Sequence, residues 1–325
     1  MSDDLPTISP EAQTFLDRNR APSLPPFSIR PWLVRRMRQR LAQSDASVIA
    51  DIESRLMADV SLTETDGVPV VSIQPANAEP GSTKYGIYVH GGAFMFGGAE
   101  DALGMLMADA LGLEVVSLEY PLSPEAAYPA ALDECVRAYE HITGSLGPSC
   151  VLFGASTGAN LVLAMMQRIR ARGLVVPAGI GLISPCADLN PSGDSRMANA
   201  VRDPVARWRN HFDKAFASYA RHAEVENPLV SPIHADFTGD YPPTIITTGT
   251  RDLFLSDSVR LASRMRRAGQ SPELRVHEGM WHAFLDQLDI PEATESRKEI
   301  ALFLNDALGV NRSDIAEDRS ATART

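Results

Sequence analysis

A glycine-flanked serine is the sequence feature that most restricts how this chain can fold. Residues 154–158 read GASTG, directly after an apolar run at 151–153 and directly before residues 159–164, which have a helical pattern. This order predicts a strand, a sharp turn and a helix. The turn is crowded, because a side chain at position 154 or 158 would collide with the neighbouring strand or helix. We therefore expect the hydroxyl of Ser156 to stand above the end of a β-sheet.

Strand-like runs alternate with helical patterns along most of the chain. Such alternation predicts an α/β fold, with a mostly parallel central sheet and helices on both of its faces. The expected strands are 68–73, 85–89, 113–118, 151–153, 179–183, 244–248 and 274–277.

Composition excludes several classes of partner. The net charge of −11 argues against binding to nucleic acid or to an anionic membrane surface, because both would repel the chain. The first four residues are acidic where a signal peptide is basic, and no apolar run reaches the ~18 residues of a membrane span. We expect a cytoplasmic protein. A chain of 325 residues can bury a large core in one elaborated domain or in two.

Cysteine spacing and short motifs give no sign of a bound group. Cys135, Cys150 and Cys186 are scattered without metal-ligand spacing, and two of them adjoin apolar strands, so we expect buried free thiols. The sequence contains no metal motif, phosphate-binding loop or dinucleotide fingerprint. We therefore expect neither a metal nor a cofactor.

Ser156 has two suitable partners for nucleophilic catalysis later in the chain. A serine hydroxyl needs a base to accept its proton and a carboxylate to orient that base. Asp252 follows the expected strand 244–248, and His282 follows the strand 274–277 and a short turn. Since ligands bind at the carboxyl ends of the strands in such sheets, we expect the three side chains to converge there. Asp257 is a rival acid, but it lies about one turn into the next helix.

Small residues after the strand 85–89 can supply donors for a developing negative charge. Residues 90–94 read HGGAF, and small side chains let backbone N–H groups approach a substrate closely. We expect the amides of Gly91, Gly92 and Ala93, joined by that of Thr157, to hold an oxyanion. The structural alternative is a tight turn with positive φ, and both can hold at once.

Two segments interrupt the alternation and define the expected domain organisation. Residues 1–60 are helical, and residues 186–230 form an insertion too long for an ordinary loop. We expect them to cap a core made of residues 61–185 and 231–308, with residues 309–325 as a disordered tail. The arginines between 35 and 40 are expected to form a solvated charged face.

A helix with an aromatic stripe is predicted inside the insertion. Asp203 is a suitable N-cap and Pro204 a suitable first-turn residue. The apolar side chains that follow are expected to pack on the N-terminal helices as a lid, either lining a pocket or forming the lid core. They are Val205, Trp208, Phe212, Phe216 and Tyr219. The candidate substrate-binding residues are Phe94, Trp208, Phe212 and Phe216.

From about residue 70 to 308 the chain resembles the bacterial hormone-sensitive-lipase family of α/β-hydrolase esterases. The matching segments are HGGA at 90–93, YPLSPE at 120–125, GASTG at 154–158, YPPT at 241–244, Asp252-Leu253 and His282-Ala283-Phe284. This resemblance implies an α/β-hydrolase fold with a helical cap and a serine carboxylesterase acting on short to medium acyl esters. Its substrate would be a small-molecule ester.

The chain departs from the family pattern at several positions beside the expected site. Ala93 replaces the third glycine of the HGGG tract, Ala155 an acidic residue or threonine, and Thr157 an alanine. Pro121 and Leu253 also differ from the usual residues. None removes a triad member or a backbone donor. Because Ala93 and Thr157 add bulk beside the reacting carbonyl, we expect them to disfavour bulky groups around the ester carbon.

Two other functions stay open at the level of sequence. The same three side chains could act on an amide, a formamide or a lactone, because the acyl-transfer machinery is shared. A non-catalytic receptor is the second alternative, since fold alone does not fix function. The sequence leaves the oligomeric state open.

Overall fold

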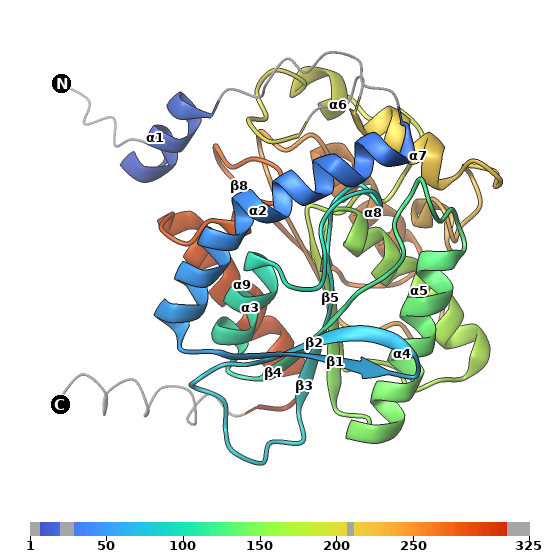
Figure 1. The fold of residues 1–325 in the computed structure, drawn as a ribbon. Coiled ribbons are helices and arrows are strands. Elements are labelled where there is room, and N and C mark those ends of the chain that lie inside the picture. Colours follow the sequence, from blue (N-terminus) through green and yellow to red (C-terminus); the bar gives the residue numbers. More distant parts are fainter. Residues whose placement is uncertain (1–6, 20–28, 207–210, 311–325) are drawn as a thin grey trace.

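A computed structural model describes residues 7–19, 29–206 and 211–310 (Figure 1). Within these ranges the strands form one eight-stranded sheet in the order β1-β2-β4-β3-β5-β6-β7-β8. Two pairings, β1 with β2 and β2 with β4, are antiparallel, and the other five are parallel. The predicted mostly parallel sheet is therefore confirmed.

The seven predicted strands occur at the expected places, and one further strand precedes them. The strands are β1 (Asp59–Thr65), β2 (Val68–Gln74), β3 (Tyr85–Val89), β4 (Glu114–Leu118), β5 (Cys150–Ala155), β6 (Gly179–Ile183), β7 (Thr244–Gly249) and β8 (Glu273–His277). The unpredicted strand, β1, lies at the edge of the sheet, and most of its side chains are exposed. An exposed edge strand needs no buried apolar face, so its sequence carries a weak strand signal.

Helices cover both faces of the sheet, as predicted. Figure 1 shows α3 and α9 on one face and α4, α5 and α8 on the other, and the two faces have separate clusters of buried apolar side chains. The helices are α1 (Pro10–Arg18), α2 (Pro31–Leu56), α3 (Ala102–Leu111), α4 (Ala130–Leu146), α5 (Thr157–Arg172), α6 (Ser195–Ala198), α7 (Asp213–Tyr219), α8 (Leu255–Arg267) and α9 (Pro291–Ala307), with 3₁₀ turns η2 (Pro232–His234) and η3 (Phe284–Asp286).

The N-terminal helices are held against segments that lie far from them in sequence. In α2, Arg38 donates to the carbonyls of Met95 and Ser123 and pairs with Glu125. The expected solvated face therefore fits Arg35, whose side chain is 65% exposed, but is wrong for Arg38, at 22%. Arg38 is an anchor because buried carbonyl groups need donors.

The insertion between β6 and β7 contains α6, α7 and η2. Its aromatic side chains contact loops of the sheet domain rather than only the N-terminal helices: Tyr219 stacks on Phe94 at 3.7 Å between ring centroids. Phe212 lies edge-on to Phe254 at 5.3 Å. The side chains that follow β3 and β7 are apolar there, which explains why the stripe packs inward. Residues 207–210, including Trp208, and the tail beyond 310 lie outside the described residues.

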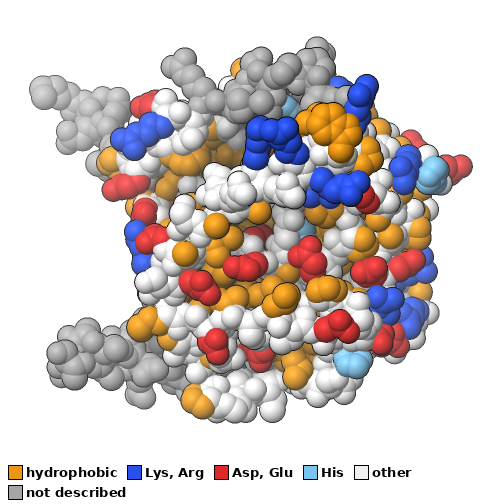
Figure 2. Space-filling view, viewed as in Figure 1, with side chains coloured by type: hydrophobic (Ala, Val, Ile, Leu, Met, Phe, Trp, Pro, Cys, Tyr) orange, Lys and Arg blue, Asp and Glu red, His pale blue; other side chains and the backbone are white. Residues whose placement is uncertain are grey.

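Charged side chains lie at the surface of the protein, whereas its three cysteines lie in the interior. Figure 2 shows many acidic side chains across the middle of one face, with apolar side chains between them. Cys135, Cys150 and Cys186 are buried free thiols, as predicted. In the part of the chain that the structure describes, no helix combines the length and the apolarity needed to cross a bilayer.

The central strand β5 gives a direct test of the fold. Leu152 is fully buried in β5, whereas Leu62 in the edge strand β1 is 77% exposed. Leu152→Ala should lower the free energy of unfolding by about 2–5 kcal/mol, because it leaves a cavity in a packed core. The matched change Leu62→Ala should alter it by less than about 0.5 kcal/mol. Urea denaturation of both variants measures the difference, and equal destabilisation would contradict the sheet order.

Candidate active site

Ser156 occupies a strained turn between β5 and α5. Its backbone has φ 55° and ψ −118°, a left-handed conformation that is rare for a residue with a side chain. The N–H of Ser156 donates to the carbonyl of Ile183 at 2.8 Å, and its own carbonyl accepts from the N–H of Cys186 at 3.2 Å. These bonds hold the turn against β6, so the strained residue is fixed by its neighbours.

The glycines on either side of the serine have no room for a side chain. A Cβ at Gly158 would lie 2.0 Å from the carbonyl oxygen of Val89, and one at Gly154 would lie 2.7 Å from the carbonyl carbon of Gly158. Both contacts are to backbone atoms, which cannot move aside cheaply. The collision expected from the sequence is therefore confirmed. Glycine at 154 and 158 allows the end of β5 and the start of α5 to pack closely at the turn.

The side chains of Ser156, His282 and Asp252 form a continuous hydrogen-bonded series. His282 Nε2 lies 2.9 Å from Ser156 Oγ, and His282 Nδ1 lies 3.0 Å from Asp252 Oδ1. The three residues follow β5, β8 and β7, so the carboxyl ends of parallel strands bring them together. With Nδ1 protonated toward the carboxylate, Nε2 is free to accept the serine proton.

Asp252 is fully buried and bound on both carboxylate oxygens. Oδ1 accepts from the N–H of Phe254 at 2.8 Å, and Oδ2 accepts from the hydroxyl of Thr248 at 2.8 Å. Burial alone favours the neutral acid, but the charge and hydrogen bond of His282, together with the N–H of Phe254, hold the pKa of Asp252 below its ordinary value. The carboxylate is therefore charged when the imidazole gains a proton.

The pKa of His282 is shifted in the opposite direction from that of Asp252. Burial disfavours the imidazolium, but the charge and the hydrogen bond of Asp252, with a further contribution from Asp203, raise the pKa of His282 above its ordinary value. A base with a raised pKa accepts a proton more readily. The backbone after His282 is fixed as well, because the N–H of Ala283 donates to Ser184 Oγ at 3.0 Å.

The rival acid, Asp257, has a different environment. Its carboxylate pairs with the guanidinium of Arg196 at 2.8 Å and accepts from the N–H of Asp188 at 3.0 Å. Both side chains of the ion pair are almost completely buried. Asp257 therefore joins α8 to the insertion, and Asp252 is the carboxylate that contacts the imidazole.

The loop after β3 lies against the serine in a left-handed conformation. Gly92, Ala93 and Phe94 have φ values of 111°, 57° and 56°. A Cβ at Gly91 would lie 3.2 Å from the Cβ of Ser156, and one at Gly92 would lie 2.1 Å from the carbonyl oxygen of Phe96. Gly92 thus combines a positive φ with a contact that leaves no room for a side chain, and Gly91 is restricted by close approach. The expected tight turn with positive φ is confirmed, and the role of these amides in holding an oxyanion stays a prediction.

Thr157 contributes a contact that the sequence did not predict. Its hydroxyl accepts from the N–H of Phe94 at 3.3 Å, and its side chain is fully buried. The bulk of Thr157 is therefore directed at the loop after β3. Ala93 does line the cavity described next, so the expected crowding near the reacting carbonyl depends on Ala93.

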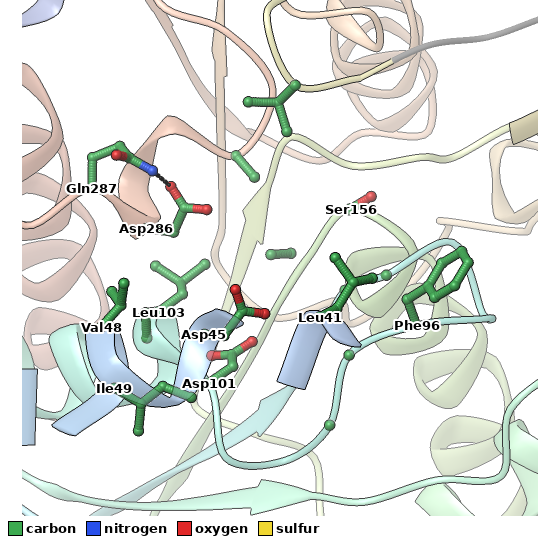
Figure 3. A pocket seen from close by; sticks show the side chains of 18 of the residues that line it. Leu41, Asp45, Val48, Ile49, Phe96, Asp101, Leu103, Ser156, Asp286 and Gln287 are labelled. Atoms are coloured by element: carbon green, nitrogen blue, oxygen red, sulfur yellow. Dashed lines mark hydrogen bonds between the residues drawn. The ribbon is translucent and has the colours of Figure 1, made fainter. Parts of the chain in front are cut away.

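A cavity of about 1890 Å³ opens above the serine. Ser156, His282, Gly91, Gly92 and Ala93 lie in its wall, and α2 and α1 supply much of the remainder. Figure 3 shows Leu41, Asp45, Val48 and Ile49 on the α2 side, and Asp101, Leu103, Asp286 and Gln287 around them. The cavity is therefore apolar over much of its length, with several carboxylates.

The aromatic residues expected to bind substrate occupy different places. Phe212 lines the cavity, whereas Phe94 and Phe216 are almost completely buried and pack against each other at 6.1 Å. The left-handed backbone at Phe94 turns its ring inward, toward Tyr219. Phe96, two residues later, lines the cavity instead (Figure 3). Trp208 lies outside the described residues.

Three polar residues of the insertion contact the loops of the candidate site. They were not assigned to the site from the sequence. Ser195, Asn199 and Asp203 are buried, and each hydrogen-bonds to the turn that carries Asp252. Asp203 was predicted as a helix N-cap. It does accept from the N–H groups of Val205 and Ala206, each at 2.9 Å, but the described helix α7 begins only at Asp213. The four-residue spacing of Ser195, Asn199 and Asp203 was the sequence signal that could have identified them as one polar stripe.

Comparison with known proteins agrees with the fold. Residues 86–286 match a protein family described as having the alpha/beta hydrolase fold. The chain belongs to this α/β-hydrolase family.

Named relatives of the hydrolase support the narrower resemblance as well. The chain is 30% identical to an acetyl-hydrolase of Streptomyces hygroscopicus, over 69% of this chain and 76% of the relative. The crystal structure of an esterase has a TM-score of 0.85 and 28% identity, covering 94% of this chain and 97% of that one. A hormone-sensitive lipase from a metagenome library has a TM-score of 0.77 and 28% identity, covering 91% and 98%. The predicted resemblance to the bacterial hormone-sensitive-lipase family is confirmed.

The crowded turn of the hydrolase can be tested with two glycines. Gly158→Ala should lower kcat/KM by about 10²-fold or more, because the new Cβ displaces the turn that aims Ser156. It should also destabilise the fold by about 2 kcal/mol, as overpacking does. Gly144 lies in α4 with no atom within 4 Å of an added Cβ. Gly144→Ala should keep full activity and stabilise the helix by about 0.5–1 kcal/mol. Ester hydrolysis and thermal melting measure both, and equal behaviour of the two variants would refute the crowding.

Proposed function

We propose that the protein is a serine carboxylesterase that cleaves short to medium acyl esters through an acyl-enzyme. The observation that carries the proposal is the hydrogen-bonded series from Ser156 through His282 to Asp252. Family membership supports the same reaction class, because an acetyl-hydrolase and esterases are among its relatives. A receptor that had lost catalysis would have no need of an aligned nucleophile, base and acid.

In the first half of the reaction, His282 Nε2 takes the proton of Ser156 as Oγ attacks the ester carbonyl. The amides of Gly92, Ala93 and Thr157 receive the negative charge that forms on the carbonyl oxygen, and each such donor contributes about 3 kcal/mol in acyl transfer. The imidazolium then gives its proton to the departing alcohol oxygen as the ester C–O bond breaks. Asp252 stabilises the positive ring through both steps.

The second half repeats the chemistry with water. His282 removes a proton from a water molecule whose oxygen attacks the acyl carbon of the acyl-enzyme. The collapse of this second tetrahedral species returns the proton to Ser156 Oγ and releases the carboxylic acid. Because the same donors bind both oxyanions, one set of amides serves the two steps.

The cavity wall favours neutral esters with an apolar acyl group. Leu41, Val48 and Ile49 provide apolar contacts for an acyl chain (Figure 3). Burial raises the pKa of Asp101 to about 7 and that of Asp286 to about 6, so negative charge remains in the wall at neutral pH. A substrate that carries its own carboxylate would be repelled. Three unpaired thiols fit the cytoplasmic location expected from the sequence.

Replacing the nucleophile tests the proposal. Ser156→Ala should lower kcat on p-nitrophenyl acetate and butyrate by at least about 10⁴-fold, because the acyl-enzyme cannot form. Thermal melting should show the fold intact. Labelling by a fluorophosphonate should occur in the original protein and disappear in the variant. Near-normal turnover by Ser156→Ala would exclude the mechanism.

Matched substrates test the leaving group. An ester, an amide and a lactone with the same acyl chain length should be hydrolysed with the ester preferred, measured as kcat/KM. Preference for the amide or the lactone would overturn the ester assignment while leaving the serine mechanism in place.

A further inference from the structure

The segment from Ser195 to Asp203 presents a buried polar stripe to the loops that carry the acid and the base. Ser195, Asn199 and Asp203 are four residues apart, and backbone bonds from Asn199 N to Ser195 O and from Asp203 N to Asn199 O link them at 2.8 and 2.9 Å. Their exposed fractions are 6%, 3% and 0%. Side chains at this spacing lie on one face of a helical segment.

The first two residues of the stripe bind carbonyl groups of the acid turn. Ser195 Oγ donates to the carbonyl of Leu253 at 2.8 Å and accepts from the N–H of Ser256 at 2.9 Å. Asn199 Nδ2 donates to the carbonyls of Thr250 and Asp252 at 3.1 and 2.9 Å. Together they hold the backbone on both sides of Asp252.

The third residue connects the acid turn to the base. Asp203 Oδ2 accepts from the N–H of Leu253 at 3.0 Å and from the N–H of His282 at 3.3 Å, while Oδ1 accepts from its own segment. One carboxylate oxygen therefore fixes the distance between the backbone after the acid and the backbone of the base. It belongs to the insertion, whose aromatic stripe also reaches the cavity.

We propose that Ser195, Asn199 and Asp203 form a clamp, and that Asp203 is a positioning residue that sets the alignment of His282 with Asp252 and contributes charge to the imidazolium. The inference deepens the proposed function, because it concerns the same site. The insertion then has two tasks in two stretches of chain: residues after 203 supply part of the cavity wall, and residues 195–203 fix the catalytic pair.

The charge of Asp203 gives the clamp a signature that a purely structural role lacks. The groups that face His282 are Asp252, Asp203 and Asp286, the last of which is near Arg297, and His211 lies in the same cavity wall. Burial raises the pKa of Asp203 to about 6, so the group is ionised at neutral pH. A negative neighbour raises the pKa of a histidine, and removing it lowers that pKa. His282 is active as a base when it is neutral. Removing the charge of Asp203 therefore moves the acidic limb of the pH–rate profile to lower pH.

The decisive variant is Asp203→Asn in the full chain. It keeps the shape of the side chain, removes the charge and turns part of the carboxylate into a donor facing N–H groups. We expect kcat on p-nitrophenyl butyrate to fall by about 10- to 100-fold with little change in KM, because the reacting groups lose alignment. The acidic limb of kcat/KM should move to lower pH. The low-field proton resonance of His282 Nδ1–H should also titrate at lower pH, which is a readout independent of turnover.

Two further variants separate position from charge and from stability. Asn199→Ala removes two hydrogen bonds of the clamp without a change of charge, so it should lower kcat and leave the pH midpoint of the low-field resonance unchanged. Asp188→Asn is the matched control: Asp188 is buried near the start of the insertion, but its carboxylate contacts Arg260 and the N–H of Asn190. It should lower the melting temperature while keeping the pH profile.

The outcomes discriminate between the clamp and the reaction itself. If Asp203→Asn keeps the kcat and the pH midpoint of the original protein, or changes them only as Asp188→Asn does, the clamp is refuted. If Asp203→Asn does not fold, unchanged kcat in Asn199→Ala refutes it equally. Failure of the proposed function has a separate sign, since the original protein would then hydrolyse esters no faster than Ser156→Ala.

Discussion

The left-handed backbone at Ser156 is the constraint on which the rest of the site depends. A residue with a side chain pays about 1–3 kcal/mol to hold such a conformation, so the surrounding structure must impose it. Here the imposing contacts are backbone bonds to Ile183 and Cys186 and the close approach of Gly158 to the end of β3. The same approach brings the loop after β3 beside the serine. Ser156 and the loop after β3 are therefore positioned by one packing event.

Parallel strand ends explain why distant residues meet without a special device. The parallel strands β3, β5, β6, β7 and β8 have their carboxyl ends on the same side of the sheet, and residues that follow these strands form the site. This convergence made Ser156, Asp252 and His282 predictable, because each directly follows a recognisable strand or turn. The tight turn at Gly91 and Gly92 was predictable from its small residues, since glycine is needed where the backbone approaches a neighbour or takes a positive φ.

Contacts between segments far apart in sequence were not predictable in this way. Arg38 looked like one of several solvated arginines, and only the fold brings the carbonyls of Met95 and Ser123 within its reach. Phe94 looked like a pocket residue, but its φ of 56° directs its ring into the core. The exposed edge strand β1 has too few buried side chains to show a pattern. In each case the role of the residue depends on which distant segment it contacts, and its own type does not reveal that.

The insertion shows how a segment outside the sheet can be coupled to the loops that carry Asp252 and His282. Its polar stripe bonds mainly to backbone N–H and C=O groups of the acid and base loops, and such contacts do not depend on the side chains of those loops. Phe212 of the insertion and the helix α2 meanwhile shape the cavity. Burying the Asp203 carboxylate is unfavourable by itself, but four N–H donors and a nearby imidazole offset that cost. The polar stripe (195–203) and the residues of the insertion that line the cavity (between 205 and 215) are successive parts of the chain. Residues that shape the cavity can therefore change while the contacts of the stripe with the loops around Asp252 and His282 are kept.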